Sequence, residues 1–408
     1  MYSSCYFVTK PFFLAFLLGA TILQATAQDS TLVRLIRQNQ SAMTAANGQF
    51  AGPAWPRLEK AVQASQCVLV GEAHGVAQVP QFTAAVARIF KPAVFVAEID
   101  QYQAADLSRL VAQPGPPTAY LQQYPMGLSF YSWVEEYELA RALHAQGARL
   151  VGVDQVSLLY TGRFFELLAA QAKGKAAKAY LQGQARRCQA WDRAALQQDS
   201  LQHLAMYRLP QAALDSVVLL TSKEKPAVRA MVQNFVTTRQ IYNSNGHQQR
   251  VNLMKKSWLG SLPAAGTPGP VPLLPKTLFK FGANHMARNL SVISGVFDLG
   301  SLVPNLADAQ GQRTLHLLVV GKQGTQLGSF SPTNTAAHAA PYTAAELPYL
   351  KPFFDLTGPT DWNVVDLRPL RRAIIQDKLQ VLNQEQESVI LGYDFLVVIP
   401  ETTNSRFY

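Results

Sequence analysis

Between residues 67 and 154, short apolar runs alternate with amphipathic helical segments, and this alternation limits the possible folds more than any other feature of the chain. The run 67–70 reads Cys-Val-Leu-Val, and the runs 94–97 and 150–153 are similar. Large apolar side chains recur at helical spacing after the first run, at Phe82, Val86, Ile89 and Phe90. Strands that alternate with helices predict an α/β fold, with a mostly parallel central sheet and flanking helices.

Acidic or imidazole side chains follow these three expected strands and a fourth one further along the chain. In chain order these are Glu72 and His74, then Glu98 and Asp100, then Asp154, and finally Asn284 and His285 after the apolar run 277–281. The carboxyl ends of parallel strands meet at one edge of a sheet, where α/β proteins bind ligands. We therefore expect these side chains to converge in one site, with Asp100, Asp154 and Asn284 in contact with a substrate.

The residue types suit water-mediated hydrolysis. His74 is the expected general base, because an imidazole exchanges protons near neutral pH. Glu72 or Glu98 would orient that imidazole, and His285 would donate to the developing oxyanion or to the leaving group. A Gly-x-Ser-x-Gly elbow is absent from the sequence, which argues against a serine hydrolase.

These motifs resemble the erythromycin esterase-like proteins, whose wider superfamily includes the ChaN-like haem-uptake proteins and the TIKI metalloproteases. Segments 132–137, 250–254 and 393–399 look like further elements of that family, so the resemblance spans roughly residues 55–400. It implies that Glu72, His74, Glu98 and His285 occupy the catalytic positions. In esterase members a histidine activates water and no metal is required.

The chain departs from the esterase pattern at two places. Only Ala73 separates Glu72 from His74, where the esterases have two residues, and this shorter spacing is closer to the ChaN-like branch. The esterases also carry a second His, a Glu and an Arg on the next helix. Those places here hold Ala77, Gln78 and Gln81. The general superfamily is therefore favoured over macrolide cleavage itself.

The leading hypothesis is an exported hydrolase that acts on an ester-like bond of a small molecule and requires no cofactor. We assign no metal ligand, although two histidines and two carboxylates also suit a divalent metal. The resemblance leaves three alternatives open. They are a haem- or metal-binding ChaN-like protein without hydrolase activity, a TIKI-like metal-dependent hydrolase, and a member that keeps the fold without catalysis.

Residues 1–27 have the pattern of a signal peptide, with Lys10, an apolar stretch over 11–24 and a small-residue cleavage site at 25–27. This predicts export to the periplasm or beyond, with no stable membrane insertion of the mature chain. An oxidising compartment makes a disulfide between Cys67 and Cys188 possible. The formal charge of +10 comes from scattered basic residues without a nucleic-acid motif, so no nucleic acid partner is expected.

The remaining chain divides into three predicted parts. Residues 28–159 and 263–408 form the two halves of the α/β core, and 160–262 form a large helical insertion that caps it. Within the core, 29–66 are expected to be helical and 321–341 to be loops. Later strands are expected at 314–320, 363–367 and 395–399, with Asp366 bracing Arg368.

Overall fold

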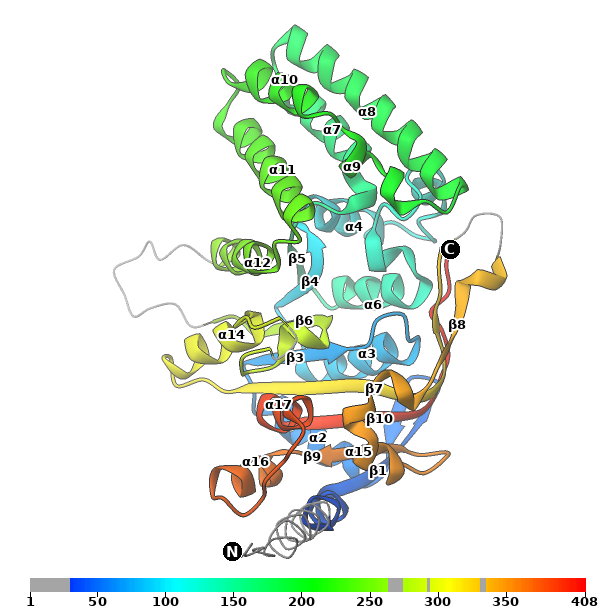
Figure 1. The fold of residues 1–408 in the computed structure, drawn as a ribbon, viewed down its shortest axis with the longest axis vertical. Helices are drawn as coiled ribbons and strands as arrows, with labels where there is room; N and C mark the ends of the chain where they lie inside the picture. Colours follow the sequence, from blue (N-terminus) through cyan, green and yellow to red (C-terminus); the bar gives the residue numbers. More distant parts are fainter. Residues whose placement is uncertain (1–29, 263–273, 292–293, 331–334) are drawn as a thin grey trace, which may run out of the picture.

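The chain folds around one mixed sheet with a parallel centre (Figure 1). The computed structural model describes residues 30–262, 274–291, 294–330 and 335–408, so the signal peptide predicted over 1–27 lies outside the described residues. Within these ranges the ten strands have the order β2-β1-β9-β10-β7-β3-β6-β4-β5, and β8 pairs with β7. Strands β10 to β5 in that order run parallel, whereas β9, β1, β2 and β8 pair antiparallel. The predicted α/β class is confirmed.

The strand bounds are β1 Gln40–Ala46, β2 Gln49–Ala51, β3 Cys67–Glu72, β4 Val94–Asp100, β5 Arg149–Asp154, β6 Thr277–Gly282, β7 Thr314–Leu327, β8 Ala339–Tyr342, β9 Trp362–Asp366 and β10 Phe395–Thr402. Successive residues of the central strands face opposite sides of the sheet. Val68 and Val70 of β3 therefore join one core, and Cys67 and Leu69 join the other. Burial on both faces explains why these strands read as continuous apolar runs.

Helices cover both faces of the sheet. One face packs against α2 Ala54–Gln63, α3 Gln78–Phe90, α4 Gln101–Val111, α5 Thr118–Gln123 and α6 Val134–Ala145. The other packs against the helical residues 30–39, α12 His247–Ser261, α13 Ala283–Met286, α14 Leu299–Asp308, α15 Lys351–Asp355, α16 Arg368–Ile375 and α17 Gln384–Gly392. Cys67 and Cys188 are buried and free, so they do not form the disulfide considered above.

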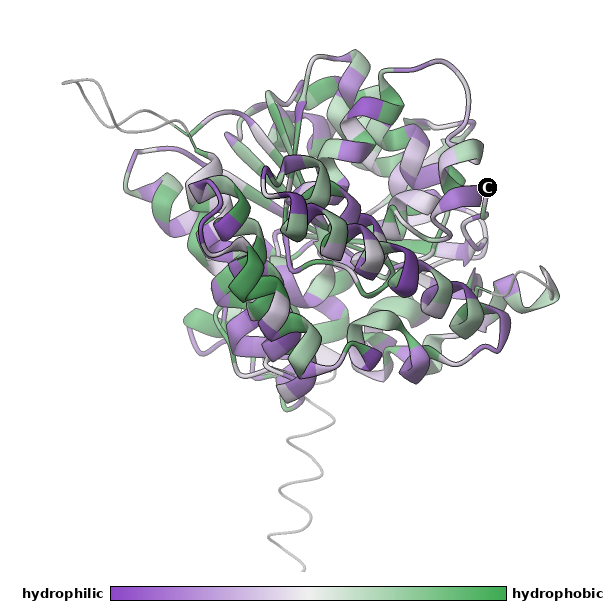
Figure 2. Cartoon of the chain, turned by 90° about the horizontal axis from the view of Figure 1, so that it is seen from above, coloured by the Kyte–Doolittle hydropathy of each residue, from purple (hydrophilic) through white to green (hydrophobic). Residues whose placement is uncertain are grey.

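A separate helical block follows β5. It consists of α7 Thr161–Gln171, α8 Lys175–Gln197, α9 Ala205–Arg208, α10 Gln211–Thr221 and α11 Pro226–Ser244, and it has its own apolar core. The block extends from the β5 side of the sheet in Figure 1, and the view from above in Figure 2 shows polar and apolar residues mixed around its helices. The predicted helical character of 160–262 agrees with these helices, while the role of the block as a cap stays a prediction.

Two expectations about secondary structure are wrong. Residues 29–66 are not all helical, because β1 and β2 form a hairpin whose turn residues Asn47 and Gly48 both have positive φ. An Asn-Gly pair favours this turn, and the sequence contained that signal. The region 321–341 is not all loop either, since β7 continues to Leu327 and pairs with β8. The strands expected at 314–320, 363–367 and 395–399 are present.

Among the described residues, none of the helices has the length and apolar character needed to cross a membrane.

Candidate active site at the carboxyl edge of the parallel strands

The four predicted catalytic side chains lie together at the carboxyl edge of β3, β4 and β6. Glu72 ends β3 and Glu98 lies near the end of β4, while His74 follows β3 and His285 lies in α13 directly after β6. Glu98 approaches both imidazoles, since its carboxylate is 3.6 Å from Nε2 of His74 and 3.3 Å from Nε2 of His285. The two rings therefore lie on either side of one carboxylate group. The expected convergence of distant strand ends agrees with this geometry.

His74 is the accessible imidazole of the cluster. Its Nδ1 lies 2.9 Å from Oε1 of Glu72, and its ring stacks on Phe130 with centroids 4.4 Å apart. The side chain is 34% exposed, whereas that of His285 is 6% exposed. Burial lowers the pKa of His74, but the hydrogen bond to Glu72 and the charges of Glu98 and Glu72 outweigh it and raise the pKa above 6.5. His74 thus has Nδ1 occupied by Glu72, while its Nε2 lies at the longer distance of 3.6 Å from Glu98 on a ring that is partly exposed.

His285 is held as a buried cation. Its Nδ1 lies 2.7 Å from Oδ2 of Asp298, and Nε2 faces Glu98. Burial opposes its charge, but the charge of Glu98 and the hydrogen bonds to Asp298 and Glu98 raise its pKa to about 10. Both ring nitrogens are therefore engaged by carboxylates, and near neutral pH the ring carries a proton on each nitrogen.

Glu98 is kept ionised by the groups around it. The guanidinium of Arg250 donates to Oε1 at 2.9 Å, and the backbone N–H of Gly282 donates to Oε2 at 2.7 Å. Burial raises the pKa of Glu98, yet His285, His74 and Arg250 together hold it well below 4.5. Arg250 also donates from Nε to Asp154 at 2.9 Å, so Asp154 contacts the cluster through this arginine.

Lys280 forms a buried ion-pair network beneath His74. Its Nζ lies 2.7 Å from Oε2 of Glu72 and 2.6 Å from Oε1 of Glu136, and all three side chains are at most 3% exposed. Burial raises the pKa of Glu72, but the charge of Lys280 and the contacts with His74 lower it overall. For Glu136 burial prevails, and its pKa rises to about 7. Lys280 therefore keeps Glu72 ionised beneath the imidazole.

Two of the predicted substrate-binding residues lie apart from this cluster. Asp100 is buried at the amino end of α4, where its carboxylate accepts hydrogen bonds from the backbone N–H groups of Tyr102, Gln103 and Ser157. Burial dominates these bonds and raises its pKa to about 7. Asn284 is exposed and lines a separate small cavity of about 50 Å³ next to Tyr393. Their contact with a substrate stays a prediction.

The sequence prediction missed Lys280, Asp298 and Phe130. A lysine inside the apolar run of β6 was a signal, because a charge in a buried strand needs a buried partner. The sequence alone could not identify Glu136 as the second partner, since that residue is far away in the chain. His247 stacks on His285 with ring centroids 5.9 Å apart.

The donor set does not fit a metal ion. No group of three or more His, Cys, Asp or Glu side chains within the described ranges is arranged to hold one. The oxygens of Glu72 and Glu98 are already engaged by Lys280, Arg250, imidazoles and a backbone N–H group. Two fixed cations beside these carboxylates would also repel a further positive charge. None of the contacts described above tests haem binding, which stays a prediction.

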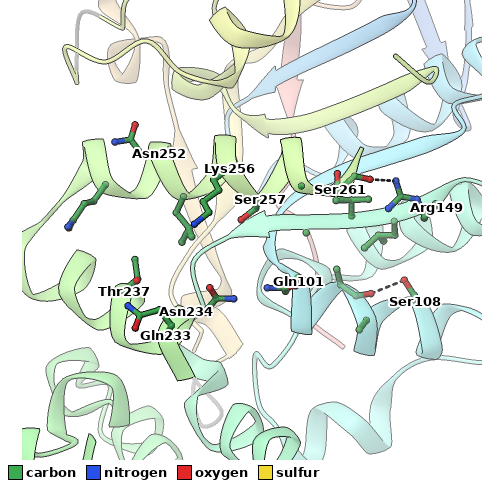
Figure 3. A pocket seen from close by; sticks show the side chains of 18 residues that line it. Gln101, Ser108, Arg149, Gln233, Asn234, Thr237, Asn252, Lys256, Ser257 and Ser261 are labelled. Atoms are coloured by element: carbon green, nitrogen blue, oxygen red, sulfur yellow. Dashed lines mark hydrogen bonds between the residues drawn. The ribbon is translucent and has the colours of Figure 1, made fainter. Parts of the chain in front are cut away.

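A cavity lies beside the edge strand β5, outside the histidine cluster (Figure 3). It has a volume of about 710 Å³ between α4, β5, α11 and α12, and Arg149 and Lys256 contribute its charged groups. Amide and hydroxyl side chains supply the remaining polar lining, and the described residues that line it include no carboxylate. Helix α12 lies between the two sites, because Arg250 points to Glu98 while Gln249 lines the cavity.

No protein-family model matches the chain, and no curated protein matches its sequence. Solved structures match most of its length. A Bacillus cereus protein aligns with a TM-score of 0.59 and 14% identity, over 93% of this chain and 99% of that one. A histidine-to-asparagine variant of the erythromycin esterase EreC in its open conformation aligns with a TM-score of 0.54 and 13% identity, over 90% and 98%. A succinoglycan biosynthesis protein aligns with a TM-score of 0.57 and 12% identity, over 94% and 99%.

At these identities the matches establish a shared fold. The chain has the fold of the erythromycin esterase EreC, so the fold that the sequence resemblance implied is confirmed. A haem-binding ChaN protein of Campylobacter jejuni is a more distant match, with 8% identity and a TM-score of 0.30, which is too low to establish a common fold.

Proposed function

We propose that this protein is a hydrolase in which His74 activates water for attack on an ester-like bond of a small molecule. The observation that carries the proposal is the pairing of Nδ1 of His74 with a buried, ionised Glu72 beneath a partly exposed ring. A carboxylate on one imidazole nitrogen fixes the tautomer that leaves the other nitrogen free to accept a proton. Export, predicted from residues 1–27, belongs to the same proposal.

In the proposed reaction, Nε2 of His74 takes a proton from water as the water oxygen bonds to the carbonyl carbon. The resulting imidazolium is stabilised by Glu72 and Glu98. When the tetrahedral intermediate expels the alcohol, His74 returns the proton to the leaving oxygen. His285 is buried with carboxylates at both nitrogens, so in this proposal it supports Glu98; direct donation by His285 to the oxyanion or leaving group stays a prediction from the sequence.

A substrate screen tests this function. The panel contains simple aryl and alkyl esters, macrolide lactones and acylated sugars, since two structural neighbours are named as an erythromycin esterase and a succinoglycan biosynthesis protein. We expect at least one ester to be hydrolysed by the purified protein in the presence of a chelator, and not by the His74→Ala variant. Equal turnover by both proteins, or turnover lost on chelation, would contradict the proposed base.

The hydrolysis rate should increase with pH, with a midpoint above 6.5. Only the neutral form of His74 can accept a proton, and its pKa is raised by Glu72 and Glu98 despite burial. Glu72→Gln removes the charged hydrogen-bond partner, so the midpoint should move to lower pH. The pH dependence of kcat/KM for both proteins checks this. A midpoint that Glu72→Gln leaves unchanged would contradict the assignment.

Gly282→Ala should reduce turnover with little effect on folding. A Cβ at this position would lie 2.8 Å from Nε2 of His74, so the imidazole must move. The backbone has φ −52°, which alanine adopts without strain. A misplacement of a catalytic group by about 1 Å can cost about 10²-fold in rate, so we expect a loss of up to this size.

Two measurements check the Gly282→Ala prediction: kcat on the best ester, and urea unfolding, where the change should stay within about 1 kcal/mol. Gly183→Ala is the matched control, because a Cβ there meets no atom within 4 Å. Full turnover by Gly282→Ala would show that Nε2 of His74 is not used.

A further inference from the structure

A second concave site lies at the opposite edge of the sheet, where β7 and β10 begin. It has a volume of about 440 Å³ and lies between the end of α2, helices α14 and α16, and the starts of these two strands. In Figure 1 the amino ends of β7 and β10 lie on the left, on the side of α14 and α16. Four arginines line the cavity, namely Arg288, Arg313, Arg368 and Arg371, together with the two aspartates Asp308 and Asp394.

Asp394 is already fully engaged. Arg288 donates to its two oxygens at 3.0 and 2.6 Å, Arg371 donates to Oδ1 at 2.8 Å, and the backbone N–H of His316 donates to Oδ2 at 2.9 Å. Two guanidinium charges therefore share one carboxylate whose hydrogen-bonding capacity is used. One positive charge of this group is left without a compensating anion.

The other two arginines do not remove this excess. Arg368 forms a bidentate pair with Asp366, at 2.8 and 2.7 Å, and so is neutralised outside the cavity. The Arg313 guanidinium is exposed and has no hydrogen bond or ion pair with another described residue. Asp308 lines the cavity but forms no ion pair within the described part of the chain.

Together with burial, this positive charge lowers the pKa of neighbouring basic groups. Burial, followed by the charge of Arg288, lowers the pKa of His316 to about 3, so the ring is neutral. The pKa of Arg371 is lowered by burial and by Arg288 and Arg368, in spite of Asp394. Nε of Arg371 is buried and has no hydrogen-bond partner in the described structure. Like charges held together in a concave site favour binding of an anion.

We propose that this cavity binds a small molecule through a phosphoryl group. The guanidinium groups come from three elements, namely the segment after α13, the segment before β7, and helix α16. A tetrahedral oxyanion with three terminal oxygens can accept hydrogen bonds from several directions, whereas a carboxylate has only two oxygens. Arginine forks match phosphate geometry, and the volume lies in the range of small-molecule sites. This inference does not depend on the proposed hydrolase.

Isothermal titration of the purified full chain tests the proposal. The probes are inorganic phosphate, glucose 6-phosphate as a phosphate monoester, and citrate as a multivalent carboxylate, in 0.15 M chloride to screen nonspecific attraction. We expect saturable binding of phosphate and of the monoester, with citrate at least about tenfold weaker because its carboxylates lack the third oxygen. Tighter binding of the monoester than of phosphate would identify an organic phosphate as the ligand, and the reverse would identify the free ion.

Charge-matched variants locate the binding. Arg313→Gln should weaken phosphate affinity about tenfold, the worth of one hydrogen bond from a charged group, and its exposed side chain can be lost without unfolding. Asp308→Asn should strengthen binding by removing a like charge. Arg372→Gln on the same α16 surface, outside the cavity, should leave affinity unchanged. Three results would overturn the proposal: no saturable binding, citrate binding as tight as that of phosphate, or equal weakening by Arg313→Gln and Arg372→Gln. The arginines and aspartates of the cavity would then be a purely structural ion-pair network.

Discussion

His74→Ala should lower kcat/KM for ester hydrolysis by about 10²–10⁴-fold, which is the usual contribution of a positioned general base. The imidazole is the accessible base of the cluster, because His285 has both nitrogens bonded to carboxylates and its pKa is about 10. Loss of the ring also leaves Glu72 without the group that it orients. Initial rates on the best substrate of the screen measure this effect.

The fold should survive this substitution. His74 is one-third exposed, and Lys280 continues to compensate Glu72 when the imidazole is absent. His144→Ala is the matched control, since His144 is an exposed residue in the last turn of α6 and makes no contact with the cluster. A His74→Ala protein that keeps more than about a tenth of wild-type kcat/KM would contradict the role of general base.

Lys280→Met should produce the largest loss of stability, about 3–5 kcal/mol, as expected when one partner of a buried ion pair is removed. Lys280 is 3% exposed and compensates Glu72 and Glu136, both at most 3% exposed. Methionine fills a similar volume but leaves these two carboxylates without their cation. The free energy of unfolding in urea, followed by circular dichroism at pH 7.5, measures the loss.

Two further variants separate charge from volume in this experiment. Lys276→Met is the control, because Lys276 is exposed and pairs with no carboxylate among the described residues; its ammonium contacts the carbonyl of Phe90 at 3.5 Å and lies 5.4 Å from the centroid of the Phe90 ring. Adding Glu72→Gln to Lys280→Met should recover part of the stability, because Glu72 is the ionised carboxylate, whereas Glu136, whose pKa is already about 7, takes up a proton when Lys280 is lost. If the Lys280→Met protein has the same free energy of unfolding as the wild type, the buried ion pairs of Lys280 do not stabilise the protein.

Local patterns were enough to predict the sheet and the ends of its central strands. Apolar runs such as 67–70 and 94–97 are fully buried and end where parallel strands present their ligands, so Glu72, Glu98 and the two histidines could be placed together. The hairpin of β1 and β2 was missed because its residues are largely exposed and lack an apolar alternation. Strand order also escaped prediction, since β3 pairs with β6 and β7, both more than 200 residues away.

The roles of the two histidines could not be read from the sequence. Both follow strands, and the difference between them arises from distant residues. Asp298 and Glu98 enclose His285 and keep it charged, while Phe130 stacks on the His74 ring, whose side chain stays about one-third exposed. Tertiary contacts of this kind have no local pattern, and the expected donor role of His285 was assigned without them.

The most direct test of the account is a nitrogen-15 NMR titration of the two site imidazoles, compared with the pH dependence of hydrolysis. We predict that His74 titrates above pH 6.5 with its proton on Nδ1 in the neutral form, and that its pKa equals the kinetic midpoint within experimental error. His285 should stay protonated through neutral pH. A neutral His285 at pH 7, or a His74 titration that does not coincide with the kinetic midpoint, would contradict the assignment of His74 as the base.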